Sequence, residues 1–183
     1  RRIKQAQFLG AMMLAYQLYN VICACTIADL RTPAFIGHHA MTALLSYFTL
    51  APFVHYYALF FIGIAEATNF PLTFVDATKA FRSLRGAFPL ANKFFRVSFA
   101  LSFFAVRMIW WPIVSLDFWR LSLAALREGT AHSMFVVGTF LVGNVFLTGL
   151  QFFWGFQLVK FVQRSFSGGK SDAENIASEK KKQ

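Results

Sequence analysis

Three ionisable side chains lie within long apolar stretches of this 183-residue sequence. His38 and His39 are adjacent near the start of one stretch, and Glu66 lies in the middle of the next. A histidine can act as a general base or a nucleophile near neutral pH, and a carboxylate beside it can orient the ring. Ionisable groups at bilayer depth are costly and therefore usually functional. His38, His39 and Glu66 are the candidate catalytic residues if the protein is an enzyme.

Structural explanations for the same residues stay open. Neighbouring residues on a helix point about 100° apart, so His38 and His39 cannot both face one cavity, while Thr42 lies one turn beyond them. The histidine pair could instead hydrogen-bond lipid headgroups at the membrane interface. Glu66 could pair with Arg107, a basic residue deep in a later apolar stretch, and such a pair could simply fix the helix register.

The composition is that of a polytopic membrane protein. Hydrophobic residues make up 57% of the chain and charged residues 14%, against about 25% charged in an ordinary globular domain. Mean hydropathy is +0.51. Each apolar run is close to or above the roughly 20 residues that cross a bilayer, and the runs are 8–28, 33–52, 55–75, 94–115 and 131–161. We expect an all-α transmembrane bundle with five spans in this chain and a sixth in the precursor. Residues 114–127 could instead form an interfacial helix.

The chain divides into a transmembrane domain, residues 1–164, and a tail, residues 165–183, that is rich in Ser, Gly, Lys and Glu. The tail has too little apolar surface to fold alone, so we expect it to be flexible and basic. Lys180 and Lys181 are fourth and third from Gln183, which matches a dilysine retrieval signal for the endoplasmic reticulum if Gln183 is the natural terminus. A solvated basic tail is the alternative. The endoplasmic reticulum is the expected location, and another organelle membrane is the alternative.

The formal net charge of +10 reflects topology rather than nucleic-acid binding. Apart from Arg107, the basic residues lie outside the apolar runs or at their ends, and they are not interleaved with exposed aromatic residues in a soluble patch. Of the 18 Lys and Arg residues, Arg107 lies within a run, five lie on one side of the five spans and twelve on the other. By the positive-inside rule, the loop of residues 76–93 and the tail are expected to face the cytosol.

Polar residues recur at helical spacing within two of the runs. Tyr16, Asn20 and Cys23 do so in the first run, and a second such stripe lies in the last. Because an unpaired amide in hydrocarbon is costly, these stripes are expected to face the bundle interior, either around a lipid cavity or in helix contacts. Pro71 should bend the helix beside Glu66. The expected cavity residues are Asn20, Thr42, Thr68, Asn69, Arg107, Asn144, Thr148 and Gln151. We expect no metal site, because Cys23 and Cys25 point to different faces of one helix.

Three sequence elements in this order resemble the TLC (TRAM/Lag/CLN) domain family over roughly residues 10 to 160. The first is His38-His39-x-x-Thr42, the second runs from Glu66 to Pro71, and the third is Arg107-x-x-x-x-Pro112. In that family one helix opens with His-His-x-x-Thr, the next carries an acidic residue near small polar ones, and a later helix carries Arg-x-x-x-x-Pro. The residues 16–20 are similar to the family's Tyr-x-x-Tyr-Asp, with Asn20 in place of the acid.

The resemblance implies a lipid-related function. The family's ceramide synthases transfer a fatty acyl group from acyl-CoA to a sphingoid amine, and carry His-Asp-x-x-Asp on the helix after the paired histidines. Here that motif falls on Ala65, Glu66 and Asn69, so one histidine and one carboxylate are absent. The pattern is closer to small TLC-domain proteins that are linked to membrane lipid composition.

We therefore expect an integral membrane protein that binds or senses lipid acyl chains, influences membrane lipid composition and needs no cofactor. Its expected partners are membrane lipids, and no nucleic acid. One alternative is a ceramide-synthase-like N-acyltransferase with acyl-CoA as co-substrate. The other is a non-catalytic subunit of a larger membrane complex, whose partners would be other membrane protein subunits.

Overall fold

A computed structural model describes residues 2–51 and 55–180, without the side chains of residues 2, 3, 55, 82 and 164–180. Every regular element in this part of the chain is helical. The α-helices are α1 (Arg2–Thr26), α2 (Pro33–Phe48), α3 (His55–Ala58), α4 (Ala65–Ala67), α5 (Asn69–Ala80), α6 (Arg82–Ala87), α7 (Pro89–Ser102), α8 (Trp111–Arg127) and α9 (Met134–Lys180). A 3₁₀ turn, η1 (Ala28–Leu30), follows α1, and two π-helical segments, η2 (Leu59–Ile64) and η3 (Phe103–Trp110), lie within longer helical stretches.

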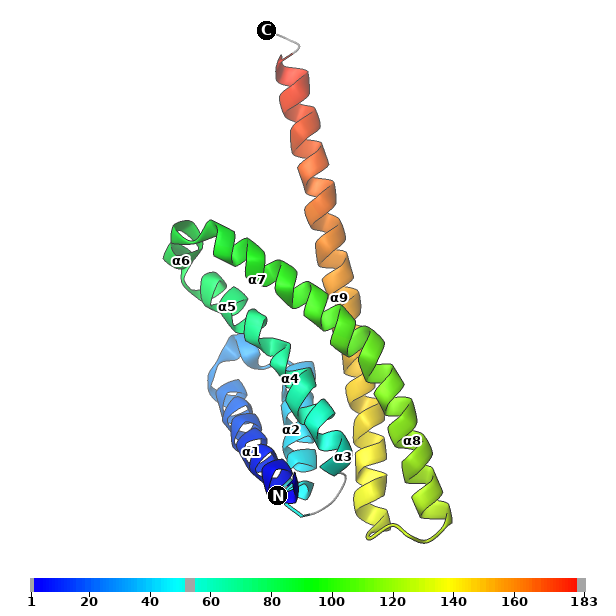
Figure 1. The fold of residues 1–183 in the computed structure, drawn as a ribbon. Helices are drawn as coiled ribbons and strands as arrows, with labels where there is room; N and C mark the ends of the chain where they lie inside the picture. Colours follow the sequence, from blue (N-terminus) through cyan, green and yellow to red (C-terminus); the bar gives the residue numbers. More distant parts are fainter. Residues whose placement is uncertain (1, 52–54, 181–183) are drawn as a thin grey trace.

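The helices form an all-α bundle, as predicted, and successive long helical stretches run in opposite directions (Figure 1). Four helical stretches are long and apolar enough to cross a membrane: Lys4–Thr26, Tyr56–Ala80, Pro89–Arg127 and Met134–Gln163. These stretches identify an integral membrane protein.

The second predicted run forms a shorter helix than its 20 residues suggested. Helix α2 has 16 residues, about 24 Å at 1.5 Å per residue, against a hydrocarbon core of about 30 Å. Thr32 caps its start by accepting a hydrogen bond from the Phe35 N–H at 3.2 Å, and Pro33 occupies the first turn. The helix ends at Phe48 rather than at Pro52, because a residue that precedes proline avoids the helical region.

The fourth run is longer than predicted. Segments α7, η3 and α8 follow one another without a break over 39 residues, so residues 114–127 continue the membrane-crossing helix (Figure 1). An interfacial helix at 114–127, the alternative drawn from the sequence, is therefore wrong. Pro112, which lacks an N–H, lies at the second position of α8, where π-helical bonding gives way to α-helical bonding.

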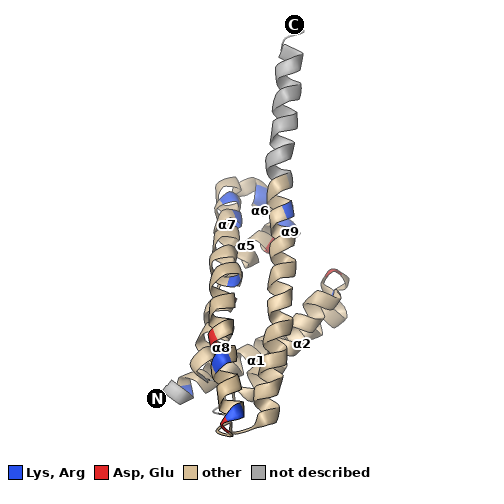
Figure 2. Ribbon diagram, turned by 90° about the vertical axis from the view of Figure 1, so that its right-hand side faces the viewer, with Lys and Arg blue, Asp and Glu red and all other residues tan. Residues whose placement is uncertain are grey.

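The two ends of the bundle differ in charge. Helix α6 and the start of α7 lie at one end, where several basic residues gather, while the connection between α8 and α9 lies at the other (Figures 1 and 2). The predicted loop of 76–93 is largely helical, because α6 occupies its middle. The cytosolic orientation and the flexibility of the tail stay predictions. Residues 181–183 and all side chains from 164 onward lie outside the described part.

The helices pack through two kinds of contact, an apolar core and a close approach of α1 to α2. Apolar side chains of α2, η2, α8 and α9 form the core, with Leu45, Phe60, Trp111 and Phe140 among them. Helix α1 instead buries small or polar residues at seven-residue intervals: Gly10, Gln17 and Ala24. A Cβ atom on Gly10 would overlap the Thr49 hydroxyl, so glycine allows α1 to approach α2 closely.

Candidate functional site

Two opposite charges are buried together in the bundle, as the sequence suggested. Arg107, on η3, is only 3% exposed, and its Nη2 atom lies 3.7 Å from Glu66 Oε1. The other carboxylate oxygen of Glu66 accepts a hydrogen bond from Asn69 Nδ2 at 2.7 Å. Neither charge would be tolerated toward lipid, and each offsets the desolvation of the other.

The guanidinium of Arg107 also satisfies a break in the neighbouring helix. The helix is interrupted at Thr68, three residues before Pro71, and Thr68 Oγ1 accepts a hydrogen bond from Arg107 Nε at 2.8 Å. Arg107 Nη2 donates to the Ala65 carbonyl at 2.9 Å and to Asn69 Oδ1 at 3.1 Å, and Nη1 donates to Gln151 Oε1 at 3.1 Å. Arg107 therefore bonds to backbone and side-chain groups around this break. The carbonyl that accepts from Arg107 is that of Ala65, whereas Pro71 leaves the Ala67 carbonyl without its helical N–H partner.

Both charged residues lie in or beside a π-helical segment. Arg107 is within η3, and Glu66 lies two residues after the end of η2. A π-helical segment widens the helix by one residue per turn and is often found at functional sites. Here the two segments are on neighbouring helices and bring Glu66 and Arg107 into reach of each other.

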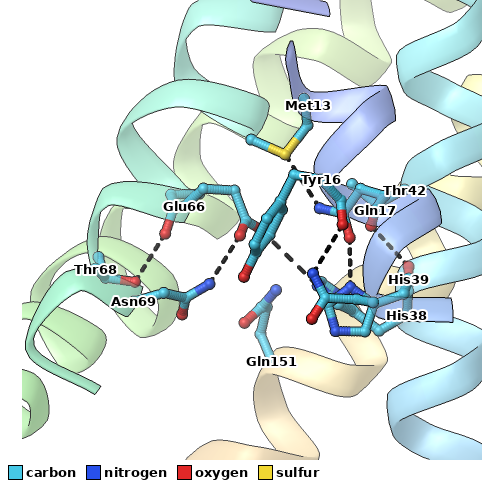
Figure 3. Close-up of polar contacts among 12 residues, drawn as sticks. Met13, Tyr16, Gln17, His38, His39, Thr42, Glu66, Thr68, Asn69 and Gln151 are labelled. Carbon is cyan, nitrogen blue, oxygen red and sulfur yellow. Dashed lines mark hydrogen bonds and ion pairs between the residues drawn. The ribbon is translucent and has the colours of Figure 1, made fainter. Parts of the chain in front are cut away.

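His38 faces Glu66 across the bundle interior (Figure 3). Its Nε2 atom is 3.9 Å from Glu66 Oε1, the same oxygen that lies near Arg107. The ring is held edge-on against Trp154, with 5.2 Å between the ring centroids. Its Nδ1 atom is buried and has no hydrogen-bond partner among the described residues. An unpaired buried nitrogen costs about 1–3 kcal/mol, so this atom is the place in the cluster where a ligand group would bind best.

His39 serves a different contact. Its Nδ1 atom is hydrogen-bonded to Gln17 Oε1 on α1, and Gln17 Nε2 in turn donates to Met13 Sδ at 3.1 Å (Figure 3). Gln17 is fully buried. The two rings touch edge to face, with 4.9 Å between their centroids, but they serve different contacts. His38 lies near Glu66, and His39 joins α2 to α1.

A narrow cavity begins at His38 and Glu66 and runs between α2, η2, α8 and α9. Its space is about 40 Å³, room for roughly three water molecules. Thr42 and Gln151 lie at the polar end. Apolar side chains form most of the remaining wall, and these are Leu45, Ala58, Phe61, Ile62, Trp111, Phe118, Phe140 and Leu147.

A second polar network stands beside this wall. Asn144 lines the cavity, donates to Ser115 Oγ at 3.1 Å and accepts from Trp119 Nε1 at 3.1 Å. Thr148 accepts a hydrogen bond from Trp111 Nε1 at 2.9 Å. These bonds join α8 to α9 and leave the apolar edges of the tryptophan rings for the bundle interior.

The structure brings most of the predicted site residues together, in three groups. His38, Glu66, Thr42, Asn144 and Gln151 line the cavity. Thr68, Asn69 and Arg107 lie beside its polar end, in the hydrogen-bond cluster of the arginine. Thr148 and His39 make the helix contacts described above.

The polar stripe predicted on α1, Tyr16, Asn20 and Cys23, is not the face of α1 that is buried. Asn20 is partly exposed and donates to the Tyr16 carbonyl of its own helix at 2.8 Å, and Tyr16 is 45% exposed. The buried polar residue of α1 is Gln17, which the sequence analysis missed. Its signal in the sequence is the seven-residue spacing from Gly10 and Ala24, since small residues mark the face on which helices approach most closely.

The chemistry that this site offers is polar and acid–base. Among the side chains that the structure describes, no group of three His, Cys, Asp or Glu residues is close enough to hold a metal ion. Glu66, Arg107 and the unpaired nitrogen of His38 place polar and charged groups at one end of a small cavity whose remaining wall is mostly apolar.

Comparison with known proteins identifies the family. The family model of the TLC domain matches residues 3–160, which is most of the chain. The comparisons with curated proteins and with solved structures gave no match. The TLC match covers the paired histidines, Glu66 and Arg107, and it extends from the start of α1 into the last spanning helix. The chain belongs to the TLC domain family of membrane proteins, which is tied to lipid biology.

Proposed function

We propose that this protein binds a lipid acyl chain in the cavity, with the polar end of the lipid at His38, and thereby influences membrane lipid composition. One observation carries the proposal: an apolar cavity ends at a buried imidazole whose Nδ1 atom has no partner among the described residues. A hydroxyl, amide or ester group of a lipid would supply that partner. The hydrocarbon chain would lie along Leu45, Phe118 and Phe140.

The small volume of the cavity means that the protein must rearrange to bind an acyl chain. Its volume of about 40 Å³ is smaller than that of a long acyl chain. Side chains along the wall must therefore change rotamer when the acyl chain enters. Such a site selects its ligand by chain shape, because each additional methylene has to displace packed side chains. A sensor of acyl-chain composition needs this property.

The two histidines provide a matched test. Wild type, His38→Ala and His39→Ala proteins are purified in mild detergent, and co-purifying lipids are identified by mass spectrometry. We expect a defined acyl lipid to be retained by wild type and by His39→Ala, and to be lost from His38→Ala. His39→Ala should lower the melting temperature, because it leaves Gln17 unpaired. Equal lipid retention by the two variants would contradict the proposal.

A second candidate, a ceramide-synthase-like acyltransferase, is favoured by the distance of 3.9 Å between His38 Nε2 and Glu66 Oε1. In that reaction His38 would accept the amine proton as the amine nitrogen attacks the acyl-CoA thioester, and the coenzyme A thiolate would leave. A carboxylate that orients a histidine is the usual arrangement of a general base. The absent second carboxylate and histidine, at Asn69 and Ala65, weigh against it.

An activity assay separates the two functions. Purified protein is incubated with long-chain acyl-CoA and a sphingoid base, and the N-acyl product is measured by mass spectrometry. The binding proposal predicts no product above background. Product formed by wild type and by His39→Ala, and absent from His38→Ala, would make the acyltransferase the better account.

We also propose the endoplasmic reticulum as the membrane, where Lys180 and Lys181 would act as a dilysine retrieval signal if Gln183 is the natural terminus. An amino-terminal fluorescent tag leaves the tail free. We expect the tagged protein to colocalise with an endoplasmic-reticulum marker, and replacement of both lysines by serine to shift it to later membranes. A location that does not change with the lysines would contradict their role.

A further inference from the structure

A second hollow lies on the outer surface of the bundle, apart from the cavity at His38. It is an open groove of about 750 Å³ between the α3–η2 segment and α8. This is within the roughly 300–1,000 Å³ that ligand sites usually occupy. The wall residues on α8 recur at helical spacing, namely Ile113, Leu116, Asp117 and Arg120.

The groove changes from apolar to polar along its length. Ile64 and Phe60 of η2 face Trp110 and Ile113 at one end, and all four are lining residues. Because α8 runs antiparallel to α3 and η2, Tyr56 and Tyr57 lie at the other end, together with Asp117 and Arg120. Tyr56 is the second residue of α3, so this end is near the membrane surface. An acyl chain and its headgroup have the same order of polarity across half a bilayer.

The polar end has groups for both charges of a zwitterionic headgroup. Arg120 is exposed and makes no hydrogen bond or ion pair with the residues that the structure describes, which leaves its guanidinium free for a phosphate. Asp117 Oδ2 accepts a hydrogen bond from the Tyr57 hydroxyl at 2.7 Å and is exposed on the same helix face (Figure 2 shows the acidic and basic positions of α8).

Aromatic side chains complete the cation site. The rings of Tyr56 and Tyr57 are 5.0 Å apart in an edge-to-face arrangement. The face of a tyrosine ring attracts ammonium groups, including quaternary ammonium ligands. Tyr57 is buried, and its hydroxyl positions Asp117 beside the exposed ring of Tyr56. Tyr56 is 83% exposed, so its ring is available to a ligand.

We propose that this groove binds one phospholipid with an ammonium headgroup, as in phosphatidylcholine. Its phosphate is held by Arg120, its ammonium group by Asp117 and the exposed ring of Tyr56, and one acyl chain lies between η2 and α8. This site is independent of the lipid site at His38. Phosphatidylglycerol is disfavoured, because its headgroup has no ammonium to offset Asp117.

Reconstitution with defined lipids tests the site. The full chain is placed in vesicles of equimolar phosphatidylcholine and phosphatidylglycerol, extracted in mild detergent, and examined by native mass spectrometry. We expect one retained phosphatidylcholine per chain. Arg120→Gln should lower its retention about tenfold, the loss expected for one charge-assisted hydrogen bond. Arg127→Gln, the same change on the same helix outside the groove, should not.

Two further variants separate headgroup from chain recognition. Asp117→Asn keeps an acceptor for Tyr57 and should abolish the preference for phosphatidylcholine over phosphatidylglycerol. Ile113→Trp should block the groove, whereas Leu121→Trp, at a similarly exposed position of α8, should not. Equal effects within either matched pair, equal retention of the two lipids by wild type, or a second copy of the chain in place of a lipid would overturn the proposal.

Discussion

Replacing Arg107 by methionine should be among the most destabilising single changes in this protein. Methionine has a similar length but supplies none of the four hydrogen bonds that Arg107 donates. At about 0.6 kcal/mol for each bond within a membrane protein, their loss costs about 2.4 kcal/mol. Glu66 would also be left buried without its counterion, and removal of one partner of a buried pair costs about 3–5 kcal/mol. The two costs overlap, because the cost of removing one partner of a buried pair includes the hydrogen bonds of that partner. We therefore expect the free energy of unfolding to fall by about 3–5 kcal/mol.

The assay is titration of the purified protein from mild detergent into dodecyl sulfate, with unfolding followed by tryptophan fluorescence and circular dichroism. Arg96→Met is the matched control on the same helical stretch, because Arg96 is only partly buried and donates one hydrogen bond, to Asn92 Oδ1 at 3.2 Å. It should cost less than about 1 kcal/mol.

A double-mutant cycle then measures the interaction energy between Glu66 and Arg107. Glu66→Gln combined with Arg107→Met should cost less than the sum of the single changes by about 0.5–3 kcal/mol, since a neutral residue no longer needs the arginine. Equal costs for Arg107→Met and Arg96→Met, or additivity in the cycle, would refute the reasoning.

Three further predictions concern packing and orientation. Gln17→Leu should lower stability by about 1–3 kcal/mol by leaving His39 unpaired, and the double change with His39→Phe should restore part of it in thermal melts. Gly10→Ala should lower the melting temperature, because its Cβ would press on α2, whereas Gly138→Ala, which has open space, should raise it slightly. Protease added outside sealed endoplasmic-reticulum vesicles should cleave the 165–183 tail, and a protected tail would reverse the orientation.

Features that depend on the cost of burying charge in lipid were predictable from the sequence. Glu66 and Arg107 are separated by 41 positions, yet a buried acid and a buried base in one small bundle have few other ways to be neutralised. The helix break near Pro71 was predictable for a similar reason, because a missing N–H at a known position must disturb the preceding turn.

Features decided by helix packing were not predicted. Tyr16 and Asn20 look like a polar face of α1, but the buried polar residue is Gln17, because Gly10 and Ala24 let that face come closest to α2. The same packing decides which histidine lines the cavity. His39 is hydrogen-bonded to Gln17 of α1, and His38 lines the cavity. The continuity of α7, η3 and α8 depends on π-helical bonding before Pro112, for which a hydropathy pattern gives no signal.

Cryo-electron microscopy of the protein in lipid nanodiscs would test the central claim most directly. The account predicts elongated density that begins within hydrogen-bonding distance of His38 Nδ1 and continues along the apolar wall toward Phe140. The same map from His38→Ala protein should lack it. A cavity that is closed or holds only water in wild type, with Nδ1 bonded to another part of the protein, would contradict the claim.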